Sequence, residues 1–328
     1  MQQAIDLIQS SENILILSHK NPDGDAIGSM LGLAKGLKSI GKKVKCFSKD
    51  TIPGVFDFLP KVSQIENEIN PEHQNLIVLL DCALFSRTGI DNIKNIVPSF
   101  DSLLIIDHHP KNKTECDNVK NCVEIIDHKT SSTAVLVFNL LKEMNIAITK
   151  DIANCLLTGI FTDTGGFQHN NTDSESLQAA AEFMKKGSRV DKIAKNIFST
   201  KSLAAIKLWG IALERIQTDP ENGMAVSYIN KSDMDNLGVK EEELMGLVNV
   251  INTISDAKFS LLLTESVDNK IKGSLRSEEY KGIDVSRIAR SLGGGGHKLA
   301  SGFEINNADS AKSVEEIRKA ILKNNKEK

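Results

Sequence analysis

The stretch that decides the fold is Leu103-Leu104-Ile105-Ile106-Asp107-His108-His109, in which four apolar residues run directly into a carboxylate and two imidazoles. A continuous apolar run of this kind is typical of a strand that is buried on both faces. Asp and His side chains cost free energy when they are buried without partners, so the triplet is hard to explain as packing. We expect it to lie just past a strand end, where it can converge on a metal ion or a phosphate.

The same pattern recurs along the first half of the chain. Apolar runs at 13–18, 76–80, 103–106 and 123–126 each end in a polar residue, namely His19, Asp81, Asp107 and Asp127. Helical patterns separate these runs, for example over 26–40 and 132–145. Strands that alternate with helices predict an α/β fold with a doubly wound, mainly parallel sheet, in which ligands bind beyond the carboxyl ends of the strands. The polar residues should therefore gather on one edge of the sheet.

The length of 328 residues predicts about two domains. We place a catalytic domain at 1–187, a partly helical linker at 188–209 and a smaller α/β domain at 210–328. In the smaller domain the expected strands are 224–229, 259–265 and 270–276, and the expected helices are 237–252, 284–291 and 310–328.

Composition indicates which binding partners and which cellular compartment to expect. The net charge is −3, whereas a protein that grips long nucleic acid usually carries a positive excess. No apolar run is long enough to cross a membrane and no signal pattern opens the chain, so we expect a cytoplasmic protein with no membrane partner. The oligomeric state stays open, a homodimer included. Scattered cysteines indicate free thiols in a reducing compartment, at Cys46, Cys82, Cys116, Cys122 and Cys155.

The polar residues form a donor set that suits metal chemistry. It comprises His19, Asp23 and Asp25 in one loop, then Asp81, then Asp107, His108 and His109, and finally Asp163. Imidazoles and carboxylates without a thiolate favour Mn²⁺, Mg²⁺ or Fe²⁺ over structural zinc. Clustered carboxylates repel one another unless cations neutralise them. Two metals that share a bridging carboxylate would activate a water for phosphoryl displacement.

At this point the residues resemble a known family. The HxxxDxD pattern at 19–25, Asp81, the DHH triplet and Asp163 in a Thr-Asp-Thr-Gly loop are similar to the DHH phosphoesterase superfamily. The GGGGHxxAxGF segment at 293–303 resembles its DHH-associated C-terminal domain. Length and layout look closest to the NrnA-type subgroup, whose members degrade very short RNA and dephosphorylate 3′-phosphoadenosine 5′-phosphate (pAp).

The resemblance implies a role for each residue of the first site. One metal would be held by His19, Asp23 and the bridging Asp81, and the other by Asp25, Asp81, His108 and Asp163. Asp107 would orient a histidine by a hydrogen bond. His109 would face the substrate phosphate as a donor or general acid, so that the predicted catalytic residues are His109, Asp107 and Asp81. The expected cofactors are two divalent metal ions, with Mn²⁺ ahead of Mg²⁺ and Fe²⁺.

A second predicted site binds the other end of the substrate. Consecutive glycines let the backbone approach a ligand and point N–H groups at an anion, and arginine suits bidentate phosphate binding. The resemblance implies that this region holds the 5′ phosphate or base, which would favour short substrates. The predicted substrate-binding residues are Arg87, Arg276, Ser277, Gly294, Gly295, Gly296 and His297.

Some histidines have plainer interpretations. Asp127-His128 is interpreted as a strand-end turn that caps the helix beginning near Ser131, and His73 as a residue of an exposed loop. The loop after Asp163 lacks the arginine that relatives often carry. His169 has two interpretations there, as a substitute that contacts substrate and as plain loop surface.

The predicted function is metal-dependent hydrolysis of short RNA oligonucleotides and pAp. The alternative is a cyclic di-AMP or pApA phosphodiesterase with the same two-metal site. A family II pyrophosphatase fits the C-terminal segment less well, and a RecJ-type exonuclease would need further domains to hold DNA. The intact donor set argues against a nucleotide-binding regulator with a dead site.

Overall fold

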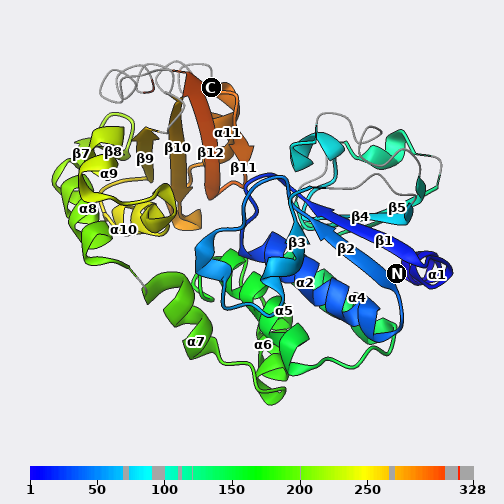
Figure 1. The fold of residues 1–328 in the computed structure, drawn as a ribbon. Coiled ribbons are helices and arrows are strands. Elements are labelled where there is room, and N and C mark those ends of the chain that lie inside the picture. The colour runs from blue at the N-terminus through cyan, green and yellow to red at the C-terminus, as the bar shows by residue number, and fades with distance from the viewer. Residues whose placement is uncertain are drawn as a thin grey trace. The chain divides into compact units, whose positions relative to one another are not determined.

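The computed structural model describes residues 1–68, 74–90, 100–109, 113–119, 121–199, 201–265, 270–306 and 317. The chain splits into two compact units, Met1–Ser199 and Thr200–Lys328, and each has its own sheet (Figure 1). The bounds that we gave for the domains and the linker stay predictions. His73 and, apart from residue 317, the predicted helix at 310–328 lie outside the described residues.

In the first unit the described strands form a parallel sheet in the order β3-β2-β1-β4-β5-β6. The strands are β1 (Asn13–Ser18), β2 (Lys43–Phe47), β3 (Ile65–Glu66), β4 (Gln74–Leu80), β5 (Phe100–Asp107) and β6 (Cys122–Ile126). The strand order reverses between β1 and β4, and such a switch point opens a crevice at the carboxyl ends of the strands. The predicted doubly wound, mainly parallel sheet is confirmed.

The central strands are apolar throughout because both faces of the sheet are covered. Ile14 and Ile16 pack into the core that α2 and α4 complete, and Leu15 and Leu17 pack into a second core on the other face. Figure 1 shows α2 and α4 along one face of the sheet. The helices of this unit are α1 (Gln2–Ser10), α2 (Gly24–Ser39), α4 (Thr133–Glu143), α5 (Lys150–Asp163), α6 (Ser174–Lys185) and α7 (Val190–Ala194).

Short helical turns complete the first unit. The 3₁₀ turns are η1 (Gly54–Phe56), η2 (Val62–Gln64), η3 (Phe85–Thr88) and η4 (Glu115–Asp117), and Lys195–Ser199 is π-helical. Residues of η3 and the segment around η4 cover the second face of the sheet. Because η3 follows β4 and η4 follows β5, both turns leave the same edge of the sheet as the polar residues.

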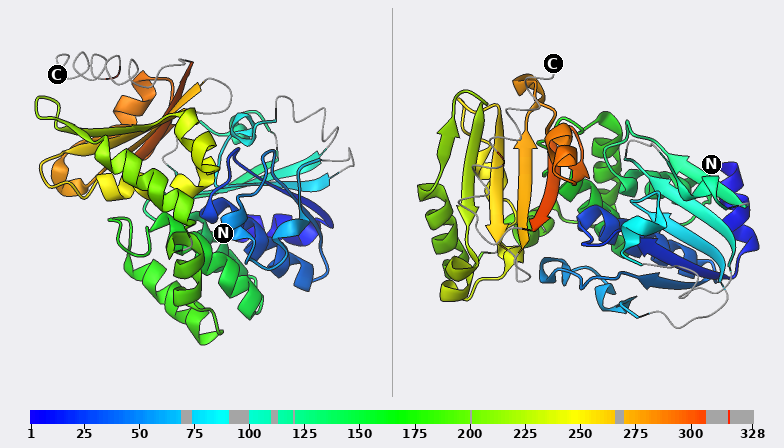
Figure 2. Two further views of the ribbon diagram at one scale, coloured as in Figure 1. Left: turned by 60° about the vertical axis from the view of Figure 1, so that its left-hand side comes forward. Right: turned by 90° about the horizontal axis from the view of Figure 1, so that it is seen from above.

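The second unit has a mixed sheet in the order β11-β12-β10-β9-β8-β7, in which only the β8–β9 pair is parallel among the described strands. The yellow to orange strands lie side by side in the right-hand view of Figure 2. The strands are β7 (Gln217–Asp219), β8 (Met224–Ile229), β9 (Phe259–Glu265), β10 (Lys270–Ser277), β11 (Gly295–Gly296) and β12 (Ala300–Asn306). The helices are α8 (Leu203–Glu214), α9 (Lys231–Leu237), α10 (Leu247–Ile251) and α11 (Val285–Ser291), with 3₁₀ turns η6 (Glu241–Leu244) and η7 (Glu279–Lys281).

The single helix that we predicted over 237–252 is wrong. The segment instead contains the end of α9, the turn η6 and the short helix α10. Gly238 and Gly246 interrupt it with φ angles of +63° and +94°. Glycine adopts this left-handed backbone at little cost. Gly238 ends α9 and Gly246 precedes α10 as its N-cap residue, and each redirects the chain.

The prediction of five free thiols is also wrong. Cys116 and Cys122 form a disulfide, with their Cα atoms 5.2 Å apart, whereas Cys46, Cys82 and Cys155 are free and buried. Cys116 lies in η4 and Cys122 begins β6. The chain must turn back between these two elements, which brings together two cysteines that form no recognisable motif in the sequence.

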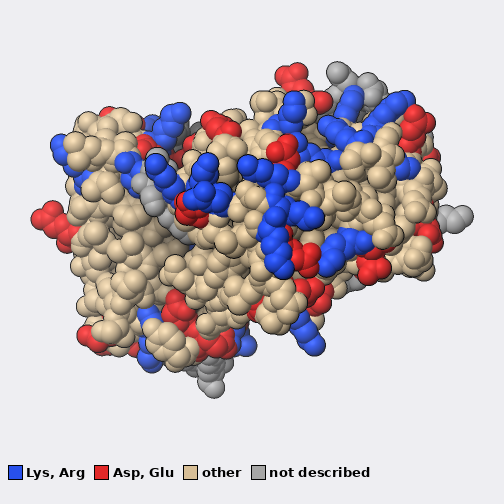
Figure 3. All heavy atoms as spheres, turned by 90° about the horizontal axis from the view of Figure 1, so that it is seen from below, with Lys and Arg blue, Asp and Glu red and all other residues tan. Residues whose placement is uncertain are grey.

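Figure 3 shows the charged side chains on one face of the molecule. On this face most Lys and Arg side chains lie in the upper and central part, with Asp and Glu side chains among and below them. Within the described residues, no helix has both the length and the apolar character needed to cross a membrane.

Candidate metal centre

The predicted site residues of the first unit converge beyond the carboxyl ends of β1, β4 and β5. Among the described residues of the first unit, three groups of three side chains place their ligand atoms within 4.8 Å of one another: His19, Asp23 and Asp81; Asp25, Asp81 and His108; and Asp81, Asp107 and His109. Asp81 belongs to all three groups. The chain therefore assembles, at the switch point of the sheet, the donor types that were predicted from its strand ends.

His19 directs one ring nitrogen at the site. Its Nδ1 lies 2.8 Å from the carbonyl oxygen of Lys20, which only an N–H can satisfy, so Nδ1 carries a proton. Its Nε2 lies 3.3 Å from Asp81 Oδ2 and 4.0 Å from Asp23 Oδ1. A histidine that donates from one nitrogen to a backbone carbonyl presents the other nitrogen to a metal in a defined orientation.

Asp81 lies at the centre of the site and is 1% exposed. It adopts φ +60°, an unusual backbone conformation for a residue with a side chain. Its Oδ2 faces His19, while its Oδ1 lies 3.6 Å from His108 Nε2 and 3.4 Å from His109 Nδ1. The two oxygens thus face different histidines, which is the arrangement that a bridging carboxylate requires.

His108 places its Nε2 among three carboxylates. The nitrogen lies 3.6 Å from Asp81 Oδ1, 3.8 Å from Asp163 Oδ2 and 3.9 Å from Asp25 Oδ2. These separations are too long for hydrogen bonds. They are close to the distance between neighbouring ligands of one ion, which is about 3 Å for an octahedral ion with bonds near 2.1 Å.

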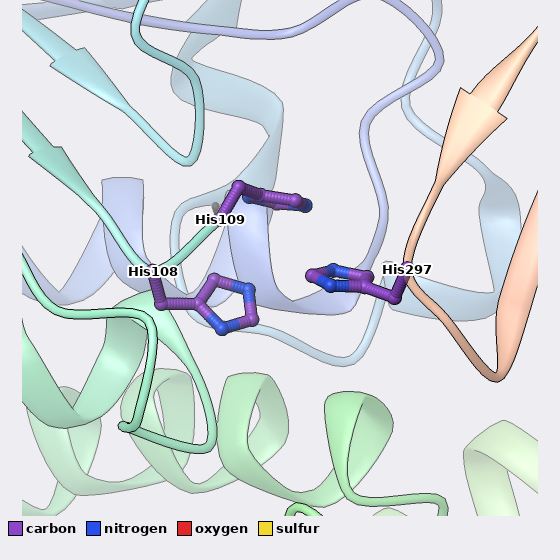
Figure 4. Close-up of side chains that lie close together, drawn as sticks. All are labelled: His108, His109 and His297. Carbon is purple, nitrogen blue, oxygen red and sulfur yellow. The ribbon is translucent and has the colours of Figure 1, made fainter. Parts of the chain in front are cut away.

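His109 is held by Asp107 rather than by the carboxylates around His108. Its Nδ1 donates to Asp107 Oδ1 at 2.7 Å, and its backbone N–H donates to the same oxygen at 3.1 Å. Figure 4 shows both histidines at the end of β5, and their ring centroids lie 4.6 Å apart. The His109 side chain is 25% exposed, compared with 5% for His108, so His109 is the more accessible of the two.

At His109 and Asp81, the neighbouring charges and hydrogen bonds shift the pKa in the opposite direction to burial. Burial acts to lower the pKa of His109, but the hydrogen bond with Asp107 and the charge of Asp81 raise it to about 9. Burial also acts to raise the pKa of Asp81, yet the hydrogen bond from His19 and the neighbouring imidazoles hold that pKa well below its usual range. Asp81 is therefore a carboxylate, and positive charge is what stabilises it.

Asp25 and Asp163 are two carboxyl groups whose charged form is disfavoured by their surroundings. Burial raises the pKa of Asp25, and the charges of Asp81, Asp163 and Asp23 raise it further. Burial likewise raises the pKa of Asp163 to about 7. A cation would relieve this repulsion. The donors in the group are imidazole nitrogens and carboxylate oxygens, so the residues fit a divalent metal ion.

Two contacts to these carboxylates were not predicted from the sequence. The Thr133 hydroxyl donates to Asp81 Oδ1 at 2.9 Å, and the Asn171 side-chain amide donates to Asp163 Oδ2 at 3.2 Å. Thr133 lies two residues after Ser131, which we used only to mark a helix start. Asn171 lies in a polar loop without periodicity, and no local signal distinguishes it there.

The proposed cap of α4 is wrong, although Asp127 and His128 do form an exposed turn after β6. The first amides of α4 instead bond to Asp25. Thr133 N–H donates to Asp25 Oδ2 at 2.6 Å, and Ala134 N–H donates to Asp25 Oδ1 at 2.9 Å. The helix is thus capped by a residue of α2 that is more than 100 positions earlier in the chain.

His169 packs back onto the end of α5. Its Nδ1 lies 3.2 Å from the carbonyl oxygen of Asp163. Gly165 has φ +58°, and a Cβ placed there would lie 2.3 Å from His169 Nε2. The imidazole therefore occupies the space that only a glycine leaves open, next to Asp163.

Arg87 is exposed in η3. Its backbone carbonyl accepts from Lys20 N–H at 2.8 Å. That bond ties η3 to the loop that carries His19, so the main chain of Arg87 supports the site whatever its side chain binds.

In the second unit, Arg276 and Ser277 end β10. Arg276 is partly buried, and its Nε donates to Asn249 Oδ1 at 3.1 Å. Ser277 is 3% exposed, and its hydroxyl donates to the carbonyl oxygen of Lys258 at 2.8 Å. The serine hydroxyl is therefore engaged within the fold, which weakens its assignment as a substrate contact.

The glycine run has different roles at different positions. Gly293 has φ +79°, and a Cβ on Gly294 would lie 2.1 Å from the carbonyl oxygen of Gly302. Gly295 and Gly296 form β11, which pairs with β12, and His297 follows in the connecting turn. Among the described residues, no atom lies within 4 Å of a Cβ placed on Gly295, and its φ is not positive. Gly295 is thus the position of the run whose lack of a side chain has neither a packing reason nor a backbone reason.

Comparison with protein-family models identifies both halves of the chain. Residues 13–160 match the model described as the DHH family, N-terminal domain, and residues 221–327 match the DHHA1 domain. The two matches together span most of the sequence and correspond to the two sheets.

Individual relatives align along nearly the whole length. A Bacillus subtilis (strain 168) protein named bifunctional oligoribonuclease and PAP phosphatase NrnA is 28% identical over 315 residues, which cover 95% of this chain and 95% of that protein. A Thermus thermophilus protein of the same name is 29% identical over 310 residues, covering 94% and 89% of the two chains. The crystal structure of an exopolyphosphatase-related protein from Bacteroides fragilis has a TM-score of 0.85 and 28% identity, covering 98% of this chain and 95% of that one.

Proposed function

The chain belongs to the DHH family, with a DHHA1 domain in its second half, and from this premise we propose that it is a metal-dependent phosphoesterase. The proposed substrates are short oligoribonucleotides and pAp, the two classes that the names of its relatives specify. The expected ions are divalent, with Mn²⁺ ahead of Mg²⁺ and Fe²⁺, because imidazoles and carboxylates together suit these ions.

One observation carries the proposal. Asp81 directs its two carboxylate oxygens at different histidines, His19 on one side and His108 on the other. This geometry supports two ions that share one carboxylate. Two such ions, when bound, supply a nucleophilic water and the positive charge that stabilises the attacking and leaving oxygens of a phosphoryl displacement.

The residues of the chain supply orientation and proton transfer. His19, Asp23 and Asp81 would hold one ion, and Asp25, Asp81, His108 and Asp163 would hold the other. Asp107 fixes His109 through Nδ1, and we assign Nε2 of His109 to the leaving oxygen of the substrate as a general acid. In the second unit, Arg276, His297 and the backbone at Gly295 would bind the other end of the substrate.

The first test is a comparison of Asp81→Asn with Asp127→Asn. Asn tolerates the left-handed backbone at position 81, so the variant loses the negative charge and keeps the fold. We expect kcat/KM to fall on the order of 1,000-fold or more in Asp81→Asn, because both ions lose their shared ligand. Asp127, the exposed acid at the next strand end, should tolerate the same change.

Rates should be measured with Mn²⁺ on pAp, di- to pentanucleotides of RNA, pApA and cyclic di-AMP. EDTA should abolish turnover and Mn²⁺ should restore it. Full activity of Asp81→Asn, or activity that resists chelation, would refute the two-metal model. A higher kcat/KM on cyclic di-AMP or pApA than on pAp and short RNA would replace the proposed substrates with the alternative ones.

A further inference from the structure

The first turn of α4 contacts two of the acidic residues of the metal centre at once. The Thr133 hydroxyl donates to Asp81 Oδ1 at 2.9 Å, and the amides of Thr133 and Ala134 donate to the two oxygens of Asp25. Asp25 and Asp81 are 1% exposed and Thr133 is 0% exposed. Three segments of the chain therefore meet at one residue, and water does not reach it.

The direction of the bond between Thr133 and Asp81 is unambiguous. A carboxylate only accepts hydrogen bonds, so the hydroxyl must donate. The bond is made to Oδ1, the oxygen that faces His108 and His109, and not to Oδ2, which faces His19. A donor on one oxygen restricts rotation of the carboxylate about its Cβ–Cγ bond, and this rotation decides which histidine each oxygen faces.

The local chemistry of α4 indicates that its first turn is shaped around these carboxylates. Ser132 occupies the N-cap position, where a serine usually accepts from the helix amides, yet it makes no side-chain cap bond. The hydroxyls of Ser131 and Ser132 are buried and have no hydrogen-bond partner among the described residues. The helix amides that a serine cap would have bound donate to Asp25 instead.

We infer that Thr133 is a positioning residue that orients the bridging carboxylate of Asp81 for both metal ions. The backbone of the same turn holds Asp25, and the hydroxyl of Thr133 sets Asp81 relative to it. The inference rests on the proposed function, because it assigns Asp81 to two ions. It adds a residue that does not itself bind metal or substrate and whose side chain acts only through Asp81.

The test removes the hydroxyl and keeps everything else. Thr133→Val has the same shape and retains both backbone amides, whereas Thr133→Ser restores the hydroxyl. Thr158→Val is the matched control, because Thr158 is equally buried but donates to Asn154 O within its own helix. Binding of Mn²⁺ should be measured without substrate, by calorimetry and by the electron paramagnetic resonance signal of free Mn²⁺.

We expect Thr133→Val to bind Mn²⁺ about 10- to 100-fold more weakly than the wild type, as is usual when a residue that orients a metal ligand is lost. Thr133→Ser should recover most of the affinity, and Thr158→Val should match the wild type. Because the ligands themselves remain, high Mn²⁺ should restore most of the kcat of Thr133→Val. Thr133→Ala, which has a high helix propensity, repeats the test if circular dichroism shows that the valine variant is misfolded.

The outcomes separate this inference from the proposed function. Wild-type Mn²⁺ affinity in a folded Thr133→Val or Thr133→Ala variant would overturn the inference alone. A wild-type protein that binds Mn²⁺ but hydrolyses no member of the substrate panel would overturn the proposed function, while the Mn²⁺ affinities would still decide the role of Thr133. A wild-type protein that binds no divalent ion would overturn both.

Discussion

At the scale of single residues, the contribution of an Arg–Asp ion pair to stability depends on how far the two side chains are buried. Arg215 and Asp233 form a two-pronged pair in the second unit, with Nη2 donating to Oδ1 at 2.9 Å, and their side chains are 27% and 13% exposed. Arg189 and Asp191 form a similar fork, but their side chains are 61% and 62% exposed. The two pairs give a matched comparison within one chain.

Asp233→Asn should lower the free energy of unfolding at pH 7 by about 1 kcal/mol. The hydrogen bond with Arg215 lowers the pKa of Asp233 below its usual value. A lowered folded-state pKa adds stability above the unfolded-state pKa of about 4, and this stability is lost as the pH falls through the folded-state pKa. The difference between variant and wild type in urea unfolding should therefore shrink below pH 4.

Asp191→Asn is the control for that experiment, because solvent screens the exposed pair. In urea, this variant should unfold like the wild type both at pH 7 and below pH 4. An Asp233→Asn variant that is as stable as the wild type at pH 7 would contradict the stabilising role of the Arg215–Asp233 pair.

At the scale of secondary-structure elements, the metal centre depends on how closely α2 and α5 approach. Gly28 of α2 faces the backbone of α5, and a Cβ placed on it would lie 2.4 Å from Cys155 O and 2.9 Å from Gly159 N. The two helices also carry Asp25 and Asp163. Backbone-to-backbone contact at Gly28 therefore sets the separation of two of the carboxylates.

Gly28→Ala should destabilise the protein by about 1 to 3 kcal/mol, because the added methyl meets backbone that cannot rotate away. Helix propensity alone would favour alanine by about 1 kcal/mol. Gly210→Ala isolates that propensity, since Gly210 lies in α8 and no atom of the described part of the chain is within 4 Å of a Cβ placed on it. The melting temperature should fall for Gly28→Ala and stay the same or rise for Gly210→Ala. An unchanged melting temperature for Gly28→Ala would mean that α2 and α5 can move apart at no cost.

At the scale of the whole molecule, the proposed function divides its tasks between the two units. It assigns the acidic centre to the first unit, and a substrate anchor at Arg276, His297 and Gly295 to the second. A net charge of −3 fits this division, because a short anionic substrate needs only a local group of donors rather than an extended basic surface.

Gly295→Ala tests the second unit with a minimal change. Gly295 has no positive φ, and no neighbour in the described structure lies within 4 Å of a Cβ placed on it, so alanine should fit the fold. If the backbone there binds a phosphate, the methyl should raise KM for pAp and short RNA about 10- to 100-fold, the value of one charged hydrogen bond. KM for bis-p-nitrophenyl phosphate, which lacks a second phosphate, should not change, and equal effects on both substrates would remove Gly295 from the anchor.

Much of the fold could be predicted because it depends on local pattern. The strands predicted at 13–18, 224–229 and 259–265 have the same bounds in the structure, and each contains an apolar segment. The helix predicted at 237–252 failed because hydrophobic periodicity does not register a left-handed glycine. The prediction of free thiols failed at Cys116 and Cys122, because two cysteines six residues apart pair only when the intervening chain turns back.

The sequence by itself determined that acidic and imidazole side chains would follow the strands of a parallel sheet, since a strand end is marked by the residue that stops an apolar run. Only the tertiary structure decided which atoms meet. Asp25 bonds to amides 108 and 109 positions away, and Asp81 divides its oxygens between His19 and the histidines after β5. Those contacts depend on how α2, α4 and α5 pack, and packing is a property of surfaces that are distant in sequence.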